Sequence, residues 1–206
     1  MESAYGHIKE ALKKALPGSI SHRKFLPQTR TLIVDRHDTG SLKHSSVMLL
    51  LFEEKEELYV CLIKRTGHMK FHPGQIAFPG GKYEDSDEDL RTTALREVEE
   101  EIGIKADAVE ILGYLTDLYI PPSNFMVRAY VGYLKEEPVF NIDDREVQEV
   151  LVLGYEHFKH PDVINIREFK THNSTRLTKA PYFEVDGAII WGATAMILTE
   201  LLDLEC

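Results

Sequence analysis

The sequence predicts an α+β fold in which helices pack on a mixed β-sheet. Apolar residues recur at helical spacing near both ends of the chain and once in its middle, and short apolar runs typical of strands lie between them. We find no internal repeat, low-complexity segment or linker. With 206 residues, 43% of them hydrophobic, the chain suffices for one substantial core. We therefore expect a single domain over residues 1–206.

The chain begins with a predicted helix over residues 4–16, which Pro17-Gly18 ends. Strands are expected at residues 31–34, 47–52 and 58–63. The last two are joined by a charged hairpin turn at residues 53–57. Residues 1–40 thus supply a helix and a lead-in strand, and a long Gly- and Pro-containing loop from Gly67 to Gly81 follows the hairpin.

The β pattern returns after residue 103. We expect strands at residues 109–115, 125–134 and 147–153. Pro121-Pro122 marks a loop between the first two. Near the end, Tyr182–Val185 and Ala188–Trp191 flank Asp186-Gly187, which is a strong signal for a two-residue hairpin. A helix over Ala193–Leu204 closes the predicted fold.

Charge and composition argue against several classes of protein. The 24 Lys and Arg residues against 34 Asp and Glu residues give a net charge of −10, which disfavours broad attraction to nucleic acid or to an anionic membrane. A small anionic substrate stays open, because a local basic patch or bound divalent cations reverse the sign inside one cleft. The longest purely apolar run, Val47–Phe52, is far shorter than the roughly 18–20 residues of a membrane-spanning helix.

The two cysteines, Cys61 and Cys206, suggest no disulfide framework. The N-terminus, Met-Glu-Ser, lacks the basic segment and apolar run of a secretory signal. We therefore expect a soluble protein of the reducing cytoplasm.

A glutamate-rich helix is predicted over residues 88–103. We expect Asp87 or Ser86 to cap its N-terminus, and Gly103 lies where a glycine commonly ends a helix. At about 100° per residue, one arc of this helix is apolar and faces the core. The arc consists of Ala94, Leu95, Val98 and Ile102.

Three carboxylates crowd together beside that arc. Glu97, Glu100 and Glu101 are related as i, i+3 and i+4, so they share one face. Like charges at this spacing destabilise a helix by roughly 0.2–0.5 kcal/mol per pair unless positive charge lies among them. Hard divalent cations such as Mg²⁺ would supply it, since they bind carboxylates together with substrate phosphates and activate water. The alternative is a solvated acidic face.

The residues from Gly81 to Ile104 distinguish these alternatives, because they closely resemble the Nudix box. That pattern is Gly, five residues, Glu, seven residues, then Arg-Glu-aliphatic-any-Glu-Glu-any-Gly-aliphatic. Residues 96–104, Arg-Glu-Val-Glu-Glu-Glu-Ile-Gly-Ile, match its second half at every specified position. The first half departs from it: Asp87 occupies the Glu position, and eight residues rather than seven separate it from Arg96.

The resemblance implies a Nudix-type α/β/α sandwich with a mixed sheet between helices, and catalysis that depends on Mg²⁺ or Mn²⁺. It implies that Glu97 and Glu101 are the main metal ligands, with Glu100 as a further ligand or water-activating group. The Gly81 carbonyl is implied as a ligand from the loop. Arg96 is implied to orient Glu97, since a guanidinium grips a carboxylate in a fixed fork and such support holds metal ligands in place.

A second signature resembles the coenzyme A-directed branch of the Nudix family and lies in residues 61–81. The positions that match are Arg65, Gly74 and Phe78-Pro79-Gly80-Gly81. The positions that depart are residues 61–63, Thr66 and Lys70, where lysine keeps the charge of the family's arginine but loses its bidentate geometry. The resemblance as a whole covers about residues 45–200, whereas the first 40 or so residues carry no family signal.

This signature implies a set of substrate-binding residues. They are Lys64, Arg65, Lys70, Gly80 and Gly81. Coenzyme A carries an internal diphosphate and a 3′-phosphate, so a basic loop just before the metal-binding helix suits it. The alternatives are that the cations only solubilise a loop and that the two glycines only form a turn.

The leading function implied by resemblance is hydrolysis of coenzyme A or an acyl derivative to 3′,5′-ADP and 4′-phosphopantetheine or its acyl form. One alternative changes the substrate to an ADP-sugar, a dinucleotide or an oxidised nucleotide. Another is a binding module without catalysis, against which the complete set of Glu97, Glu100 and Glu101 argues. The general base stays open between Glu100, Glu146 and Glu149. We expect a small-molecule diphosphate as partner, no nucleic acid or membrane, and a homodimer.

Overall fold

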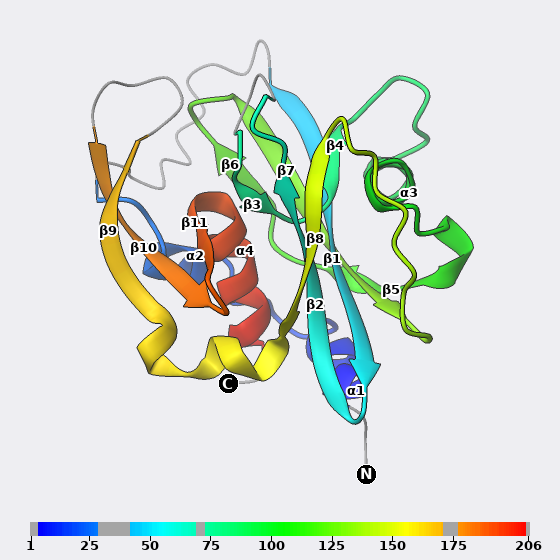
Figure 1. The fold of residues 1–206 in the computed structure, drawn as a ribbon, viewed down its shortest axis with the longest axis horizontal. Helices are drawn as coiled ribbons and strands as arrows, with labels where there is room; N and C mark the ends of the chain where they lie inside the picture. Colours follow the sequence, from blue (N-terminus) through cyan, green and yellow to red (C-terminus); the bar gives the residue numbers. More distant parts are fainter. Residues whose placement is uncertain (1–3, 29–41, 69–72, 171–176, 205–206) are drawn as a thin grey trace.

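The computed structural model describes residues 4–28, 42–68, 73–170 and 177–204, which form two sheets with helices around them (Figure 1). The α-helices are α1 (Ala4–Ala11), α2 (Ser19–Lys24), α3 (Leu90–Ile102) and α4 (Gly192–Asp203). The eight-stranded sheet contains β1 (Lys43–Glu54), β2 (Glu57–Arg65), β3 (Ile76–Ala77), β4 (Gly80–Lys82), β5 (Val109–Tyr114), β6 (Leu118–Ile120), β7 (Phe125–Leu134) and β8 (Val147–Gly154). The three-stranded sheet contains β9 (Ile164–Lys170), β10 (Leu177–Val185) and β11 (Ala188–Trp191). Short 3₁₀ helices span Ala106–Ala108, Tyr155–Lys159 and Pro161–Val163.

The larger sheet is mixed, because β1 pairs antiparallel with β2 and parallel with β7. Towards one end β1 and β2 separate, and the segment that contains β3 and β4 fits between them. β3 pairs with β2, where Ile76 lies opposite Lys64, and β4 pairs with β1, where Gly81 lies opposite Ser46. The two glycines expected near the glutamate helix therefore lie within the sheet at the point where its long strands part.

Alternating residues of the central strands divide the core into two layers. On one face, Met48 belongs to the cluster that contains Val98 and Ile102 of α3. On the other face, Leu49 belongs to the cluster that contains Met196 of α4. Figure 1 shows α3 and α4 on opposite sides of the larger sheet. The predicted α+β class, with a mixed sheet between helices, is confirmed.

The C-terminal predictions are confirmed closely. β10 and β11 form the predicted hairpin, and Asp186 and Gly187 take the positive φ angles of 50° and 79° that a tight turn of this kind requires. α4 covers nearly the whole of the predicted helix over Ala193–Leu204. The charged turn predicted at residues 53–57 is shorter, since β1 extends to Glu54 and β2 begins at Glu57.

Other predictions were wrong where local signals were weak. The helix predicted over residues 4–16 is shorter and ends at Ala11; beyond it the N–H groups of Lys13 and Lys14 bond three residues back, to Glu10 and Ala11, in tighter turns. α2 was not predicted, and neither was β9, whose side chains are mostly exposed and give no clear alternation. The loop predicted from Gly67 to Gly81 contains β3 and β4, which are too short to produce a period.

The strand predicted at residues 31–34 lies outside the described residues. Within the part of the chain that the structure describes, every helix is too short or too polar to cross a membrane. Cys61 is buried in β2 with a free thiol, and burial raises its pKa to about 12. Cys206 lies outside the described residues.

Candidate active site

The ends of α3, which carries the acidic cluster, are fixed by local hydrogen bonds. The Asp89 side chain accepts a hydrogen bond from the Thr92 N–H at 2.8 Å and caps the N-terminus. Gly103 ends the helix as predicted, in the left-handed conformation at φ 75°. The predicted cap at Asp87 or Ser86 is wrong, because Asp87 turns inward and is only 5% exposed.

Asp87 instead binds the guanidinium of Arg96 through two contacts. Arg96 Nε donates to Oδ1 at 2.9 Å, and Nη2 donates to Oδ2 at 3.1 Å. Thr93 Oγ1 donates to Oδ2 as well, at 2.9 Å. The hydrogen bond from Arg96 is the main reason that the pKa of Asp87 falls to about 2. Asp87 is therefore ionised at neutral pH and fixes the position of Arg96.

Arg96 also contacts two of the three clustered glutamates. Its Nη1 donates to Glu97 Oε1 at 2.8 Å and to Glu100 Oε2 at 2.9 Å. The Glu100 side chain is 59% exposed, whereas that of Glu97 is only 14% exposed. One guanidinium thus joins the buried Asp87 to the cluster, which is the geometry that an orienting role for Arg96 requires.

Glu101 is the most deeply buried member of the cluster. Its Oε2 accepts a hydrogen bond from the Gly80 N–H at 2.8 Å, and the nearest cationic group is Arg65, whose Nη1 lies 3.5 Å from Oε1. Burial dominates and raises the pKa of Glu101 to about 8, although Gly80 and Arg65 act in the opposite direction. Burial also raises the pKa of Glu97, against the effect of Arg96. At both carboxylates, the loss of solvation therefore outweighs the stabilisation by neighbouring donors and cations.

The two glycines before α3 are required by close contacts. A Cβ on Gly80, which has φ 152°, would lie 2.4 Å from the carbonyl oxygen of Ser46. A Cβ on Gly81 would lie 2.3 Å from Glu97 Oε1. Gly80 is therefore required by the backbone of β1, and a larger residue at Gly81 would displace the Glu97 carboxylate.

Comparison with known proteins places this arrangement in a family. The model of the NUDIX domain matches residues 42–172. The chain belongs to the Nudix family. It is 32% identical, over 186 residues, to proteins named uncharacterized Nudix hydrolase NudL from Yersinia pestis (strain Pestoides F) and Yersinia pseudotuberculosis serotype O:1b (strain IP 31758). Each alignment covers 85% of this chain and 87% of the relative.

A solved structure supports the same fold. A MutT/nudix family protein from Enterococcus faecalis superposes with a TM-score of 0.54 over 98% of this chain and 74% of its own length. The sequence identity is 18%, so this similarity concerns the fold. The prediction of a Nudix hydrolase is confirmed by the family match and by the Yersinia relatives.

Nudix hydrolases use divalent metal ions, and the donor atoms of this cluster fit such a cation. Glu97 and Glu101 offer hard carboxylate oxygens; Glu101 is buried and Glu97 half-buried, and at both the loss of solvation outweighs the nearby positive charge. Gly81 has no side chain to block the approach to Glu97. In residues 4–28, 42–68, 73–170 and 177–204, no three acidic, His or Cys side chains already converge as ligands. The carboxylates are held instead by Arg96, Gly80 and Arg65.

The structure brings together only some of the predicted substrate-binding residues. Arg65 lies beside Glu101, on the α3 face of β2. Lys64 is the preceding strand residue and therefore points to the opposite face, where its Nζ donates to Glu149 Oε1 at 2.9 Å. Lys70 lies outside the described residues.

Two residues near the cluster were undervalued from sequence. Asp87 was identified as a candidate helix cap and as a departure from the box pattern, yet it is the principal partner of Arg96. The signal available in the sequence was that Asp87 occupies the acidic position in the first half of the Nudix-like box. Glu146 is exposed, but its charge raises the pKa of both Glu97 and Glu101, so it lies within electrostatic reach of the cluster.

Proposed function

We propose that this Nudix hydrolase cleaves the diphosphate of coenzyme A or acyl-coenzyme A, giving 3′,5′-ADP and 4′-phosphopantetheine or its acyl form. The observation that carries the proposal is the contact between Arg65 and Glu101. Arg65 belongs to the segment that resembles the coenzyme A-directed signature, and Glu101 belongs to the segment that resembles the Nudix box. A diphosphate near both residues would meet a fixed guanidinium and the acidic helix together.

Glu97, Glu101 and Glu100, with the Gly81 carbonyl, are the proposed ligands of the metal. When bound there, Mg²⁺ or Mn²⁺ supplies Lewis acidity towards the diphosphate and lowers the pKa of water. Arg96 orients Glu97, and Asp87 holds Arg96 in place. The Gly80 N–H fixes one oxygen of Glu101. Each group therefore keeps a carboxylate in position before substrate arrives.

The proton acceptor for the attacking water is proposed from the exposed glutamates. Glu100 has a 59% exposed side chain on the same helix as the ligands, and Glu146 lies within electrostatic reach of Glu97 and Glu101. Glu149 forms an ion pair with Lys64, on the other face of β2 from Arg65, and is therefore a weaker candidate. Separate Glu100→Gln and Glu146→Gln variants distinguish them by which one flattens the pH–rate profile.

The test is a turnover assay with Mg²⁺ or Mn²⁺ on coenzyme A, an ADP-sugar, a dinucleotide and an oxidised nucleotide. We expect the highest kcat/KM with coenzyme A, cleavage at the diphosphate, and no turnover in excess chelator. Dephospho-coenzyme A should be a poorer substrate, since it lacks the 3′-phosphate. Faster turnover of another diphosphate would reject the substrate assignment, and full turnover in chelator would reject the metal. The single domain, the cytoplasmic location and the homodimer stay predictions.

A further inference from the structure

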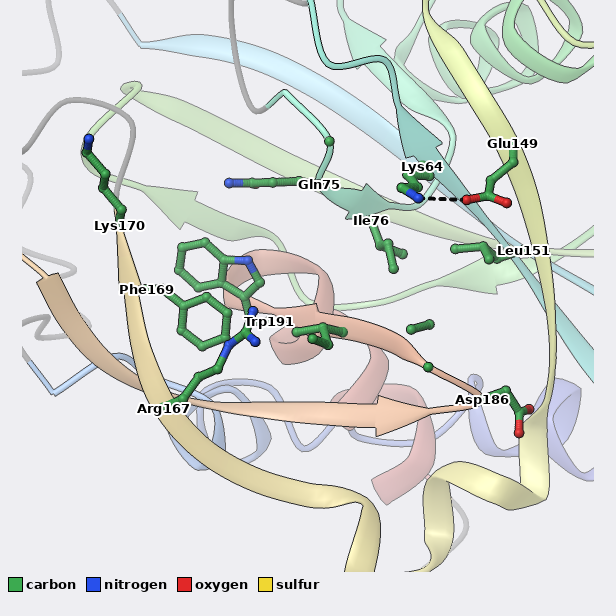
Figure 2. A pocket seen from close by; sticks show the side chains of 14 residues that line it. Lys64, Gln75, Ile76, Glu149, Leu151, Arg167, Phe169, Lys170, Asp186 and Trp191 are labelled. Atoms are coloured by element: carbon green, nitrogen blue, oxygen red, sulfur yellow. Dashed lines mark hydrogen bonds and ion pairs between the residues drawn. The ribbon is translucent and has the colours of Figure 1, made fainter.

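A cavity lies between the edge of the larger sheet and the three-stranded sheet (Figure 2). Its volume of about 580 Å³ lies within the roughly 300–1,000 Å³ typical of small-molecule sites. One wall comes from β2, β3 and β8, with Lys64, Ile76 and Leu151. The opposite wall comes from β9 and β11, with Phe169 and Trp191. None of these residues has a part in the hydrolysis proposed above, where Lys64 enters only as the ion-pair partner of Glu149.

The β9–β11 wall is a stack of flat groups. The rings of Trp191 and Phe169 are 4.2 Å apart at an angle of 10°. The Arg167 guanidinium lies over the Phe169 ring, 4.5 Å from its centroid. Figure 2 shows these three side chains gathered on one side of the cavity. Because Phe169 is held between its neighbours and is only 6% exposed, Trp191 is the member of the stack best placed to offer a planar apolar surface.

The charges that line the cavity leave an excess of cations. Glu149 is paired with Lys64 at 2.9 Å, and Asp186 is paired with His157 at 3.2 Å. Among the residues that the structure describes, neither Arg167 nor Lys170 forms an ion pair with a carboxylate. These two side chains therefore suit a negatively charged group of a ligand, such as a phosphate.

The cavity and the acidic helix lie at the same end of β2. Lys64 borders the cavity, and the next residue, Arg65, points to the other face and contacts Glu101. Gln75 also borders the cavity, and its carbonyl oxygen accepts the Arg65 N–H at 3.0 Å. A ligand that passes around this end of the sheet would therefore reach both sites.

We propose that this cavity binds the adenine nucleotide half of the substrate. The base stacks on Trp191, while Arg167 and Lys170 bind phosphate oxygens. A planar base requires an aromatic face, and stacking of this kind contributes favourably to nucleotide binding. The flexible, uncharged pantetheine arm matches neither the aromatic stack nor the two cations. The identity of the nucleotide as the 3′,5′-ADP portion of coenzyme A rests on the proposed function, whereas the stacking site does not.

The experiment uses the intrinsic fluorescence of the protein, because Trp191 is its only tryptophan. The full-length chain in chelator is titrated with 3′,5′-ADP, and separately with 4′-phosphopantetheine, so that binding is measured without turnover. We expect 3′,5′-ADP to quench the emission saturably and 4′-phosphopantetheine to leave it unchanged. No change with 3′,5′-ADP, or quenching by 4′-phosphopantetheine alone, would overturn the proposal.

Substitutions of Arg167 and Lys170 make the test more specific, because they leave the fluorescent Trp191 in place. Arg167→Gln and Lys170→Gln should each weaken 3′,5′-ADP binding by about tenfold, as expected for the loss of one charge-assisted phosphate contact. Arg23→Gln, on the exposed side of α2, is the matched control and should bind as wild type does. Unchanged affinity in both cavity variants would contradict the phosphate contacts. Quenching by 3′,5′-ADP in a protein that does not hydrolyse coenzyme A would support the cavity and reject the proposed substrate.

Discussion

Two helices of this protein each bury a glutamate, and their surroundings differ. Glu200 of α4 is fully buried, and it accepts hydrogen bonds from the Gly18 N–H at 3.1 Å and the Thr116 N–H at 3.2 Å. His22 Nε2 lies 2.8 Å from its other oxygen. Glu101 of α3 is 2% exposed, yet it has one backbone N–H at 2.8 Å and a guanidinium only at 3.5 Å.

The difference indicates what each carboxylate does. Both oxygens of Glu200 have close partners from two other segments, the α2 region and the chain just after β5, so this residue links both of them to α4. The raised pKa of Glu101 shows that its site does not fully compensate a negative charge. The metal cation proposed for this site would supply the missing positive charge. Burial alone therefore does not identify a functional glutamate, and incomplete compensation is the feature that supports the proposed metal-binding role of Glu101.

The largest expected effect comes from removing the well-compensated glutamate. Glu200→Ala leaves the buried His22 side chain and two backbone N–H groups without their partner, which should lower the free energy of unfolding by about 3–5 kcal/mol. Urea denaturation measures this loss, and Glu156→Ala, at an exposed position, is the control. The folded fraction should keep its kcat. A loss below 1 kcal/mol, about what an exposed ion pair contributes, would remove the contrast between the two glutamates.

Glu101→Gln should have the opposite effects, a large loss of kcat with little change in stability. The change keeps the shape of the side chain but removes a charge, and kcat should fall by at least about 100-fold if Glu101 binds the catalytic metal. The metal-free melting temperature should stay unchanged or rise slightly, because glutamine is neutral and the buried site disfavours a charged carboxylate at this position. Calorimetry should also find less stabilisation by Mg²⁺ than in wild type. A folded variant with near-normal turnover would show that α3 is not the metal site.

The sequence predicted the glutamate cluster of α3, but it gave no sign of the buried Glu200 on α4. The Nudix-like motif singled out Glu97, Glu100 and Glu101 because their spacing is local and falls within one helix. The site of Glu200 combines residues 18, 22, 116 and 200, and no local pattern connects positions so far apart in the chain. The same limit hid the cavity beside Trp191, since β9 has no clear alternation and the two sheets meet only in the folded chain.

The bond between Asp87 and Arg96 gives the next smaller effect. The folded pKa of Asp87 is about 2, below its ordinary 3.8, so its stabilisation is present above pH 3.8 and is lost as pH falls through 2. Asp87→Asn should lower the free energy of unfolding by about 1–2 kcal/mol at pH 7. Urea titrations at decreasing pH should find the difference from wild type shrinking below about pH 4. A difference that persists unchanged in acid would mean that the ionised carboxylate is not its source.

The smallest effect concerns Arg65, the nearest cation to Glu101 at 3.5 Å. Arg65→Gln removes one charge-assisted contact to a diphosphate, and kcat/KM for coenzyme A should fall by about tenfold. Stability should change little, because the bond to Glu101 is long and the Gly80 N–H at 2.8 Å remains. Arg23→Gln controls for loss of an arginine charge far from α3. If Arg65→Gln lowered stability as much as Glu200→Ala while leaving kcat/KM intact, Glu101 would be a second structural glutamate, and the contrast between the two helices would fail.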